Sequence, residues 1–210
     1  MRLVPVDAPF ELAGQGAELA SELLALKAAN ARLRQENEEL RGLALIDPLT
    51  KLYNRRGLDT ELDRALCASQ RNRTPAALLL IDLDGMKQVN DLLGHPEGDD
   101  LLRAVGAVLR QSVRGTDAAA RLGGDEFAVV MPSTDLEGAM VVAERIRSAI
   151  ADLGFSGRCQ AAARVTASIG VATFTGASAQ PDAITELVSA ADVALYQAKR
   201  TGKNRVVVTQ

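Results

Sequence analysis

The sequence predicts an α/β (α+β) fold in which helices flank a mixed, largely antiparallel central sheet, preceded by an N-terminal coiled-coil helix. Short apolar runs alternate with amphipathic stretches over residues 54–208, which is typical of strands and helices that pack in layers. Adjacent glycines, Gly123 and Gly124, separate two strand-like runs. They predict a tight hairpin and therefore exclude an all-parallel sheet. Leucine recurs every seven residues from Leu12 to Leu40, which is the repeat of a coiled coil.

The N-terminal part divides into a lead-in and a heptad segment. Residues 1–16 carry two prolines and two glycines, and we expect them to be flexible. Over residues 17–46, leucines occupy the d positions, and Asn30 and Asn37 occupy a positions. Leucine at d with asparagine at a favours a parallel, two-stranded coiled coil and hence a homodimer. The alternative is a single amphipathic helix packed on its own domain. The d leucines are Leu19, Leu26, Leu33 and Leu40.

Residues 47–210 are predicted to form one domain of alternating helices and strands. Pro48 restricts the residue before it, so the preceding helix should end by residue 46 or 47. Thr134 and Glu137 have the spacing of a capping box, which predicts a helix start there. Helices are expected over residues 54–71, 98–113, 134–153 and 182–200. Strands are expected over residues 77–82, 118–122, 126–131, 165–173 and 205–208.

Composition and charge exclude several classes of function. The net charge of −3 argues against a nucleic-acid-binding surface. The single histidine excludes a multi-histidine metal centre, and Cys67 and Cys159 lie too far apart for metal-ligand spacing. Apolar runs are shorter than a membrane span, and the N-terminus lacks the pattern of a secretion signal. We therefore expect a soluble, cytoplasmic protein without membrane insertion.

Four acids flank the predicted strand ends. Asp82 and Asp84 close the first apolar run, and Asp125 and Glu126 follow the Gly-Gly turn. Alternate residues of a strand share a face, so we expect the four carboxylates to cluster. Such a cluster needs cations, and Mg²⁺ binds one or two carboxylates together with substrate phosphates. Gly85 leaves room for a phosphate to approach backbone N–H groups. The alternative is a solvated hairpin with charged residues at its turn.

Five motifs together give the chain a clear resemblance: Asp47–Arg56, Asp82–Asp91, Leu93–Asp99, Gly123–Phe127 and Ala194–Arg205. It resembles the GGDEF-domain diguanylate cyclases, which condense two GTP into cyclic di-GMP and release two pyrophosphates, over about residues 46–208. The resemblance implies a nucleotide-cyclase, palm-like GGDEF fold and a phosphodiester-forming nucleotidyltransferase. Met86 stands where the family usually has Phe, and Lys203 stands where Arg is commoner.

The resemblance implies a metal site and catalytic residues among these acids. Asp82, the carbonyl of Leu83, Asp125 and Glu126 are the expected ligands of Mg²⁺ or Mn²⁺, with two ions per active site. Asp125 is also expected to accept the proton of the attacking hydroxyl, with Glu126 beside it as a second catalytic acid. Asp84 is either a further ligand or a structural residue.

GTP recognition is assigned to a second group of residues. Guanine presents N–H donors, so Asp99 and Asn90 are expected to accept or complete hydrogen bonds with it, as at the matching family positions. The alternatives are a helix-capping aspartate and a turn asparagine. The lysines of the motifs are candidate triphosphate contacts, although isolated lysines are usually solvated. The remaining substrate-binding candidates are Gly85, Met86, Lys87, Lys199 and Lys203.

A product-binding site is expected away from the hairpin. Arg114 and Asp117 have the family spacing of an inhibition motif, and Arg145 matches an assisting position. Cyclic di-GMP is thus expected as both product and inhibitor, whereas the alternative is a salt bridge at a helix end. One GTP binds per domain, so the reaction needs a dimer. The rival functions are a non-catalytic GGDEF module that serves as a GTP or cyclic di-GMP receptor, and a coiled-coil scaffold.

Overall fold

The computed structural model describes residues 22–32, 45–153, 165–175 and 182–209, and the chain divides into two units, Met1–Ala44 and Leu45–Gln210. Residues 22–32 form a helix, as the heptad pattern predicts. Leu23 and Leu26, at a and d positions, are 53% and 65% exposed on it. The rest of the predicted coiled coil before residue 45 lies outside the described residues. Leu45 and Ile46 are not helical, and Ile46 forms a β-bridge with Tyr53. The predicted coiled-coil helix of residues 17–46 therefore extends too far at its C-terminal end.

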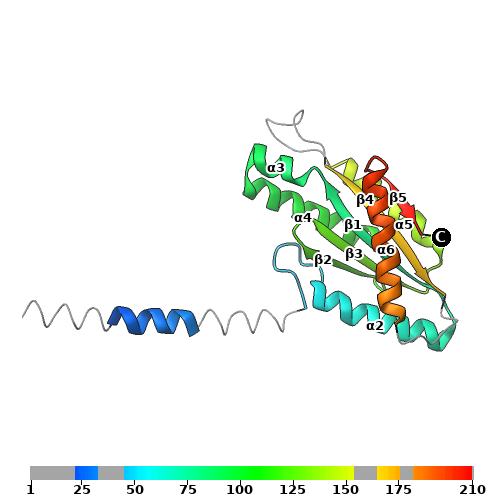
Figure 1. Cartoon of the computed structure of the whole chain (residues 1–210), viewed down its shortest axis with the longest axis horizontal. Coiled ribbons are helices and arrows are strands. Elements are labelled where there is room, and N and C mark those ends of the chain that lie inside the picture. The colour runs from blue at the N-terminus through cyan, green and yellow to red at the C-terminus, as the bar shows by residue number, and fades with distance from the viewer. Residues whose placement is uncertain (1–21, 33–44, 154–164, 176–181, 210) are drawn as a thin grey trace, which may run out of the picture. The chain divides into compact units, whose positions relative to one another are not determined.

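The second unit is built on a five-stranded sheet with the order β2-β3-β1-β4-β5 (Figure 1). The central strand β1 pairs antiparallel with β3 and β4. β2 pairs antiparallel with β3, and β5 pairs parallel with β4. The prediction of a mixed, largely antiparallel sheet is confirmed. The strands are β1 (Ala76–Asp84), β2 (Ala118–Gly123), β3 (Glu126–Pro132), β4 (Thr166–Phe174) and β5 (Val206–Val208).

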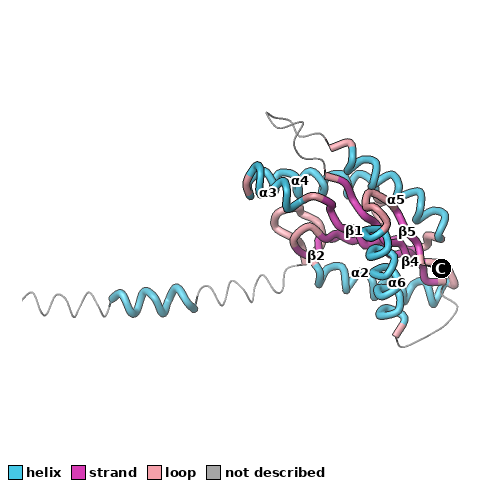
Figure 2. Tube along the Cα trace, turned by 45° about the horizontal axis from the view of Figure 1, so that its top comes forward, coloured by secondary structure: helices cyan, strands magenta, loops and turns pink. Residues whose placement is uncertain are grey.

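Helices cover both faces of this sheet (Figure 2). The apolar side chains of α3, α4 and α5 pack with Leu79 and Ile81 of β1 in one core layer. Those of α2 and α6 pack with Leu78 and Leu80 in the other. Strand β1 reads as a continuous apolar run because both of its faces are buried. The helices are α2 (Arg55–Asn72), α3 (Met86–Leu93), α4 (His95–Ser112), α5 (Leu136–Ala151) and α6 (Ala183–Arg200).

Three local predictions differ from the structure. Helix α3 was not anticipated, and α4 begins at His95 rather than near residue 98. The predicted capping box is wrong, because Asp135 is the N-cap of α5 and its side chain accepts a hydrogen bond from the N–H of Gly138. The Thr134 hydroxyl instead donates to the carbonyl of Pro132. The aspartate one residue further along therefore caps the helix in place of the threonine.

The opening residues of the second unit cover the edge of the sheet. Tyr53 forms a parallel bridge with Ala120 of the edge strand β2. Its N–H donates to the Ala119 carbonyl, and its carbonyl accepts from the N–H of Arg121. The outer edge of β2 is therefore partly paired, as edge strands usually require. In the part of the chain that the structure describes, every helix falls short of the length or apolarity needed to cross a membrane.

Candidate active site

The predicted catalytic acids lie where β1 ends beside the β2–β3 hairpin. Asp82 is the cross-strand partner of Glu126. The N–H of Leu83 donates to the backbone carbonyl of Asp125 at 3.1 Å. The hairpin turn needs a left-handed residue, and Gly124 supplies it with a φ of +51°. The tight glycine turn is confirmed, and the pairing of β1 with β3 brings residues more than 40 positions apart in the sequence together at one end of the sheet.

Asp82 sits in an environment that disfavours its charge. Its side chain is only 14% exposed, and Oδ2 lies 2.7 Å from Nζ of Lys199 on α6. Burial raises the pKa of Asp82, and the hydrogen bond and charge of Lys199 oppose this effect. The charges of Asp125 and Asp84 raise the pKa further, so that it stays above its ordinary value. A cation at this position therefore stabilises the charged carboxylate.

The hydrogen bonds of Asp84 favour the structural one of the two roles predicted for it. The residue is 8% exposed. Its Oδ1 accepts from the Ser168 hydroxyl at 2.9 Å, and its Oδ2 accepts from the Thr166 hydroxyl at 2.8 Å. Oδ2 also accepts from the backbone N–H of Asn204 at 3.1 Å. Both carboxylate oxygens are therefore engaged in tying β1 to β4 and to the chain after α6.

The expected cluster of four acids does not form. Among residues 45–153, 165–175 and 182–209, no three acidic, histidine or cysteine side chains are arranged to hold a metal ion. Glu126 lies within 4.0 Å of Arg55, and its side chain is half exposed. The donor set still fits Mg²⁺ or Mn²⁺, because Mg²⁺ takes one or two carboxylates and completes its shell with water and phosphates. Asp82, Asp125 and the carbonyl of Leu83 offer hard oxygen ligands of this kind.

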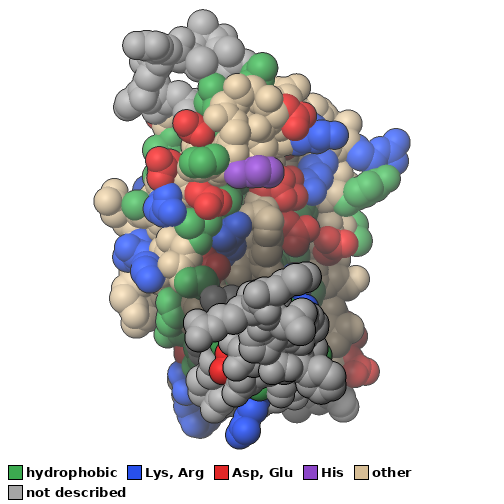
Figure 3. Space-filling model, turned by 90° about the vertical axis from the view of Figure 1, so that its left-hand side faces the viewer, with side chains coloured by type: hydrophobic (Ala, Val, Ile, Leu, Met, Phe, Trp, Pro, Cys, Tyr) green, Lys and Arg blue, Asp and Glu red, His purple; other side chains and the backbone are tan. Residues whose placement is uncertain are grey.

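The predicted guanine-binding residues line one pocket of about 420 Å³. Asn90 of α3 and Asp99 of α4 face it together with the hairpin tip. A side chain at Gly98 would place its Cβ 2.1 Å from Oδ1 of Asn90, so glycine leaves the asparagine its room. Figure 3 shows acidic and basic side chains mixed around the chain's single histidine, His95, which also lines the pocket. The other lining residues are Met86, Lys87, Asp91, Leu102, Arg121, Gly124 and Asp125.

The start of α3 offers a second kind of binding group next to this pocket. Gly85 follows β1 directly, with a φ of +87°, and it is the N-cap of α3 without a capping side chain. The first N–H groups of a helix have no partner within the helix, and they favour an anion. Met86 and Lys87 stand at this N-terminus and line the pocket. The structure thus places these three substrate-binding candidates side by side.

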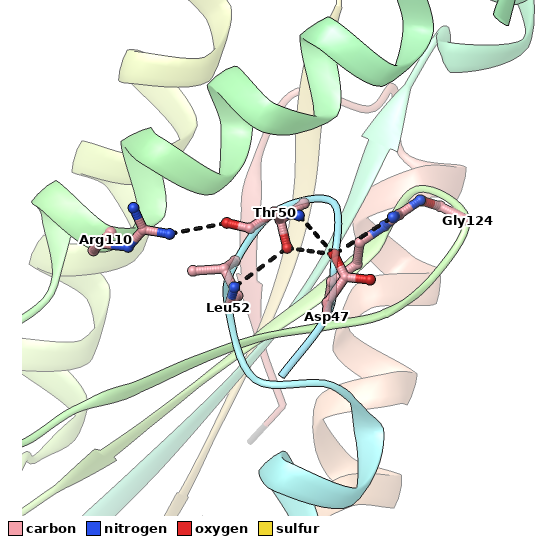
Figure 4. Close-up of polar contacts among 6 residues, drawn as sticks. Asp47, Thr50, Leu52, Arg110 and Gly124 are labelled. Atoms are coloured by element: carbon pink, nitrogen blue, oxygen red, sulfur yellow. Dashed lines mark hydrogen bonds and ion pairs between the residues drawn. The ribbon is translucent and has the colours of Figure 1, made fainter. Parts of the chain in front are cut away.

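A hydrogen-bonded chain joins the opening turn of the domain to the hairpin (Figure 4). Asp47 Oδ1 accepts from the Thr50 N–H at 2.8 Å and from its hydroxyl at 2.7 Å, and it lies 3.6 Å from Nη1 of Arg121. Arg121 Nε and Nη2 donate to the Gly124 carbonyl at 3.1 and 2.8 Å. Arg110 Nη2 donates to the Thr50 carbonyl at 2.9 Å. The sequence analysis missed Arg121, although its place two residues before the Gly-Gly pair was a usable signal.

The Asp47→Asn variant is expected to lower the free energy of unfolding by about 1 kcal/mol near neutral pH, because charged acceptors make stronger hydrogen bonds than neutral ones. Burial acts to raise the pKa of Asp47, but the hydrogen bonds from Thr50 and the charge of Arg121 outweigh it and hold the pKa below 3.8. The stabilisation is therefore present above the pKa of the unfolded chain. It is lost as the pH falls through the lower pKa of the folded protein.

Urea unfolding at several pH values measures this difference. The exposed Asp59 on α2 offers the control, and Asp59→Asn is expected to change stability by less than about 0.5 kcal/mol. A difference between wild type and Asp47→Asn that grows as the pH falls below 4 would contradict the argument.

The two lysines near the C-terminus occupy different positions. Lys199 reaches the acids directly through Asp82. Lys203 lies in the loop after α6, next to Asn204, whose N–H donates to Asp84. Lys199 therefore contacts the end of β1 through its own side chain. Lys203 is linked to the end of β1 through the hydrogen bond of Asn204 to Asp84.

The predicted product site lies at the other end of α4. Arg114 and Arg145 line a pocket of about 540 Å³, which shares no lining residue with the pocket at Asn90. Asp117 lines a neighbouring pocket of about 350 Å³ together with Arg114. Its Oδ2 accepts from the backbone N–H of Arg114 at 2.8 Å, so this carboxylate closes the turn through the main chain. Arg145 donates to the carbonyl of Ser112.

Comparison with known proteins gives consistent matches. The family described as "Diguanylate cyclase, GGDEF domain" matches residues 44–205. The uncharacterized protein YhcK of Bacillus subtilis is 42% identical over 170 residues, 80% of this chain and 46% of YhcK. The response regulator PleD of Caulobacter vibrioides is 39% identical over 176 residues, 83% of this chain and 38% of PleD. The chain therefore spans less than half the length of these two curated relatives.

A solved structure also resembles this chain. The crystal structure of the coiled coil and GGDEF domain of DgcB from Caulobacter crescentus, in complex with c-di-GMP, superposes with a TM-score of 0.72 at 32% identity. The match covers 91% of this chain and 99% of that chain. The described fold is therefore that of a solved, ligand-bound relative.

Proposed function

Because the chain belongs to the diguanylate cyclase GGDEF family, we propose that it condenses two GTP molecules into cyclic di-GMP and two pyrophosphates. One observation carries the proposal: Asp82 and Asp125 meet at one end of the sheet, beside the pocket lined by Asn90 and Asp99. Binding groups for guanine and for phosphate thus stand next to a pair of carboxylates that favour a cation.

The proposed mechanism assigns each group a task. Asp99 and Asn90 bind the guanine edge, and the N-terminus of α3 holds phosphate oxygens at Gly85, Met86 and Lys87. Lys199 adds positive charge beside the triphosphate, and Lys203 is a further contact from the loop after α6. These groups orient the α-phosphorus toward the 3′-hydroxyl of the second GTP.

The acids then serve the transfer itself. Asp125 accepts the proton of the attacking hydroxyl, and Glu126 stands beside it at the hairpin. Asp82, Asp125 and the carbonyl of Leu83 would hold Mg²⁺ or Mn²⁺, and Glu126 would have to leave Arg55 to join them. A divalent cation bound there supplies a lower hydroxyl pKa and neutralises the charge that grows on the phosphoryl group.

A second domain is required, because each domain presents one GTP and the two nucleotides must meet face to face. The heptad segment supplies this partner as a parallel homodimer. Pairing through a coiled coil raises the local concentration of the second half-site without any new contact at the nucleotides. The exposed a and d leucines of residues 22–32 support this role.

The direct test is incubation of the protein with GTP and Mg²⁺, followed by chromatography for cyclic di-GMP and measurement of released pyrophosphate. Formation of both products in a 1:2 ratio supports the cyclase. Binding of GTP or cyclic di-GMP without turnover would instead support a receptor. Failure to bind either nucleotide would favour a scaffold.

Cyclic di-GMP is further proposed to inhibit the enzyme at Arg114, Asp117 and Arg145. Arg114→Ala is expected to weaken cyclic di-GMP binding at least about tenfold, because a charged hydrogen-bond donor to phosphate or guanine is lost. Titration calorimetry measures this affinity. The matched control is Arg64→Ala, on α2, where the side chain is 70% exposed. If wild type and Arg114→Ala bind cyclic di-GMP with equal affinity, Arg114 is not part of the inhibitory site.

A further inference from the structure

The loop that joins α6 to β5 has an unusual backbone. Gly202, Lys203 and Asn204 have φ values of +125°, +60° and +45°. Left-handed conformations are unfavourable for residues with a Cβ, and they persist where surrounding contacts over-determine them. The lysine of this loop is thus held in one place by its neighbours rather than by its own preference.

The neighbours that hold the loop come from three elements. From β1, the Asp84 carboxylate accepts from the Asn204 N–H at 3.1 Å. From α5, Arg147 Nη1 donates to Asn204 Oδ1 at 2.6 Å. From α6, the Ala198 carbonyl accepts from the Lys203 N–H at 3.0 Å. Asn204 is therefore held by hydrogen bonds of both its main chain and its side chain.

The side chain of Arg147 is also held in place by a second residue, Glu144. Glu144, one turn earlier on α5, accepts from Nε at 2.9 and 3.0 Å and from Nη2 at 2.6 Å. The Arg147 side chain is only 20% exposed. The hydrogen bonds to Arg147 lower the pKa of Glu144, so the pair is charged at neutral pH. A guanidinium can grip a carboxylate with one edge and still donate from its remaining nitrogen, whereas a lysine cannot.

We propose that Arg147 is a positioning residue for the triphosphate of GTP, acting through Asn204 to hold Lys203 toward the phosphates. The inference rests on the proposed function, which assigns Lys203 to the triphosphate. It adds a residue on α5, outside the nucleotide pocket. Since Asp84 stands two residues after Asp82 on β1, the same contacts fix Lys203 relative to the catalytic strand.

The test compares two nucleotides by calorimetry. The α,β-methylene analogue of GTP carries all three phosphates but cannot release pyrophosphate, and GMP lacks the two outer phosphates. Arg147→Ala is expected to weaken binding of the analogue about tenfold while leaving GMP affinity unchanged. Arg147→Lys should behave similarly because it lacks the fork. The control is Arg64→Ala, because Arg64 pairs with Glu61 at the same spacing on α2 and touches no loop of the site.

A second background separates positioning from general damage. In a Lys203→Ala protein, adding Arg147→Ala should cause no further loss, since two residues that act through one contact are not additive. Asn204→Gly retains the backbone N–H and tolerates the positive φ, and it should reproduce the loss of analogue affinity. Because Asn204→Gly leaves α5 unchanged, it tests the positioning of Lys203 even if Arg147→Ala destabilises α5.

Several results would overturn the inference. These are an equal loss of GMP and analogue affinity in Arg147→Ala, full additivity with Lys203→Ala, or unchanged analogue affinity. A wild-type protein that binds the analogue but makes no cyclic di-GMP refutes the cyclase proposal alone, because the effect of Arg147 is read from binding. A wild-type protein that makes cyclic di-GMP but does not prefer the analogue over GMP refutes the inference alone.

Discussion

Replacing Asp125 with alanine is expected to reduce the rate of cyclic di-GMP formation at least about 10³-fold, because a proton acceptor alone contributes 10²–10⁴-fold and a cation ligand is lost with it. The fold should survive the change. The contact that fixes the tip of the hairpin uses the backbone carbonyl of Asp125 and the N–H of Leu83. Guanine binding should survive as well, since Asn90 and Asp99 belong to α3 and α4.

The measurement is initial-rate formation of cyclic di-GMP with GTP and Mg²⁺, together with affinity for the α,β-methylene analogue of GTP. Asp100→Ala is the control, because this acid on α4 is 77% exposed and pairs only locally with Arg103. The control should keep wild-type turnover. More than a tenth of the wild-type rate in Asp125→Ala would show that the hairpin acid is not central to the reaction.

Charged residues at two d positions should have an effect of similar size, but only in dilute protein. Leu26→Glu combined with Leu33→Glu places like charges in the predicted seam, which disfavours pairing. Turnover then depends on chance encounters of two loaded domains, so activity per molecule should rise with protein concentration. Specific activity over a dilution series, with light scattering for the mass, measures the effect. Affinity for the GTP analogue should not change.

The same helix supplies a matched control. Leu24 is 69% exposed but falls at a b position of the heptad. Leu24→Glu should therefore leave both mass and turnover as in the wild type. A double variant that remains a dimer, or that keeps full activity as a monomer, would refute the proposed role of the heptad segment.

Local patterns were enough to predict most of the fold. The apolar run of β1, the glycine hairpin and the helical periodicities of α2 and α6 are each visible within a few neighbouring residues. Helix α3 escaped notice because it has only eight residues, follows β1 after the single residue Gly85 and lacks a capping side chain. The start of α5 was misplaced because Thr134 and Asp135 offer overlapping capping patterns.

The candidate site could be predicted in its residues but not in their pairings. The motifs indicated Asp82, Asp125, Asn90 and Asp99, and the structure brings them to one end of the sheet. The engagement of Asp84 depends on residues 82 and more positions away. Such partners follow from the order of strands in the sheet, which local spacing does not determine.

The central position of β1 bears on how such a protein is controlled. The strand is hydrogen-bonded along both edges, by β3 and β4, and buried on both faces. Its amide hydrogens should therefore be among the slowest in the described domain to exchange with solvent, and its carboxylates stand on a strand that resists deformation. Reshaping the site is then a costly way to switch activity. Under the proposed two-domain mechanism, moving whole domains together or apart would leave each site intact and change only how often two loaded sites meet.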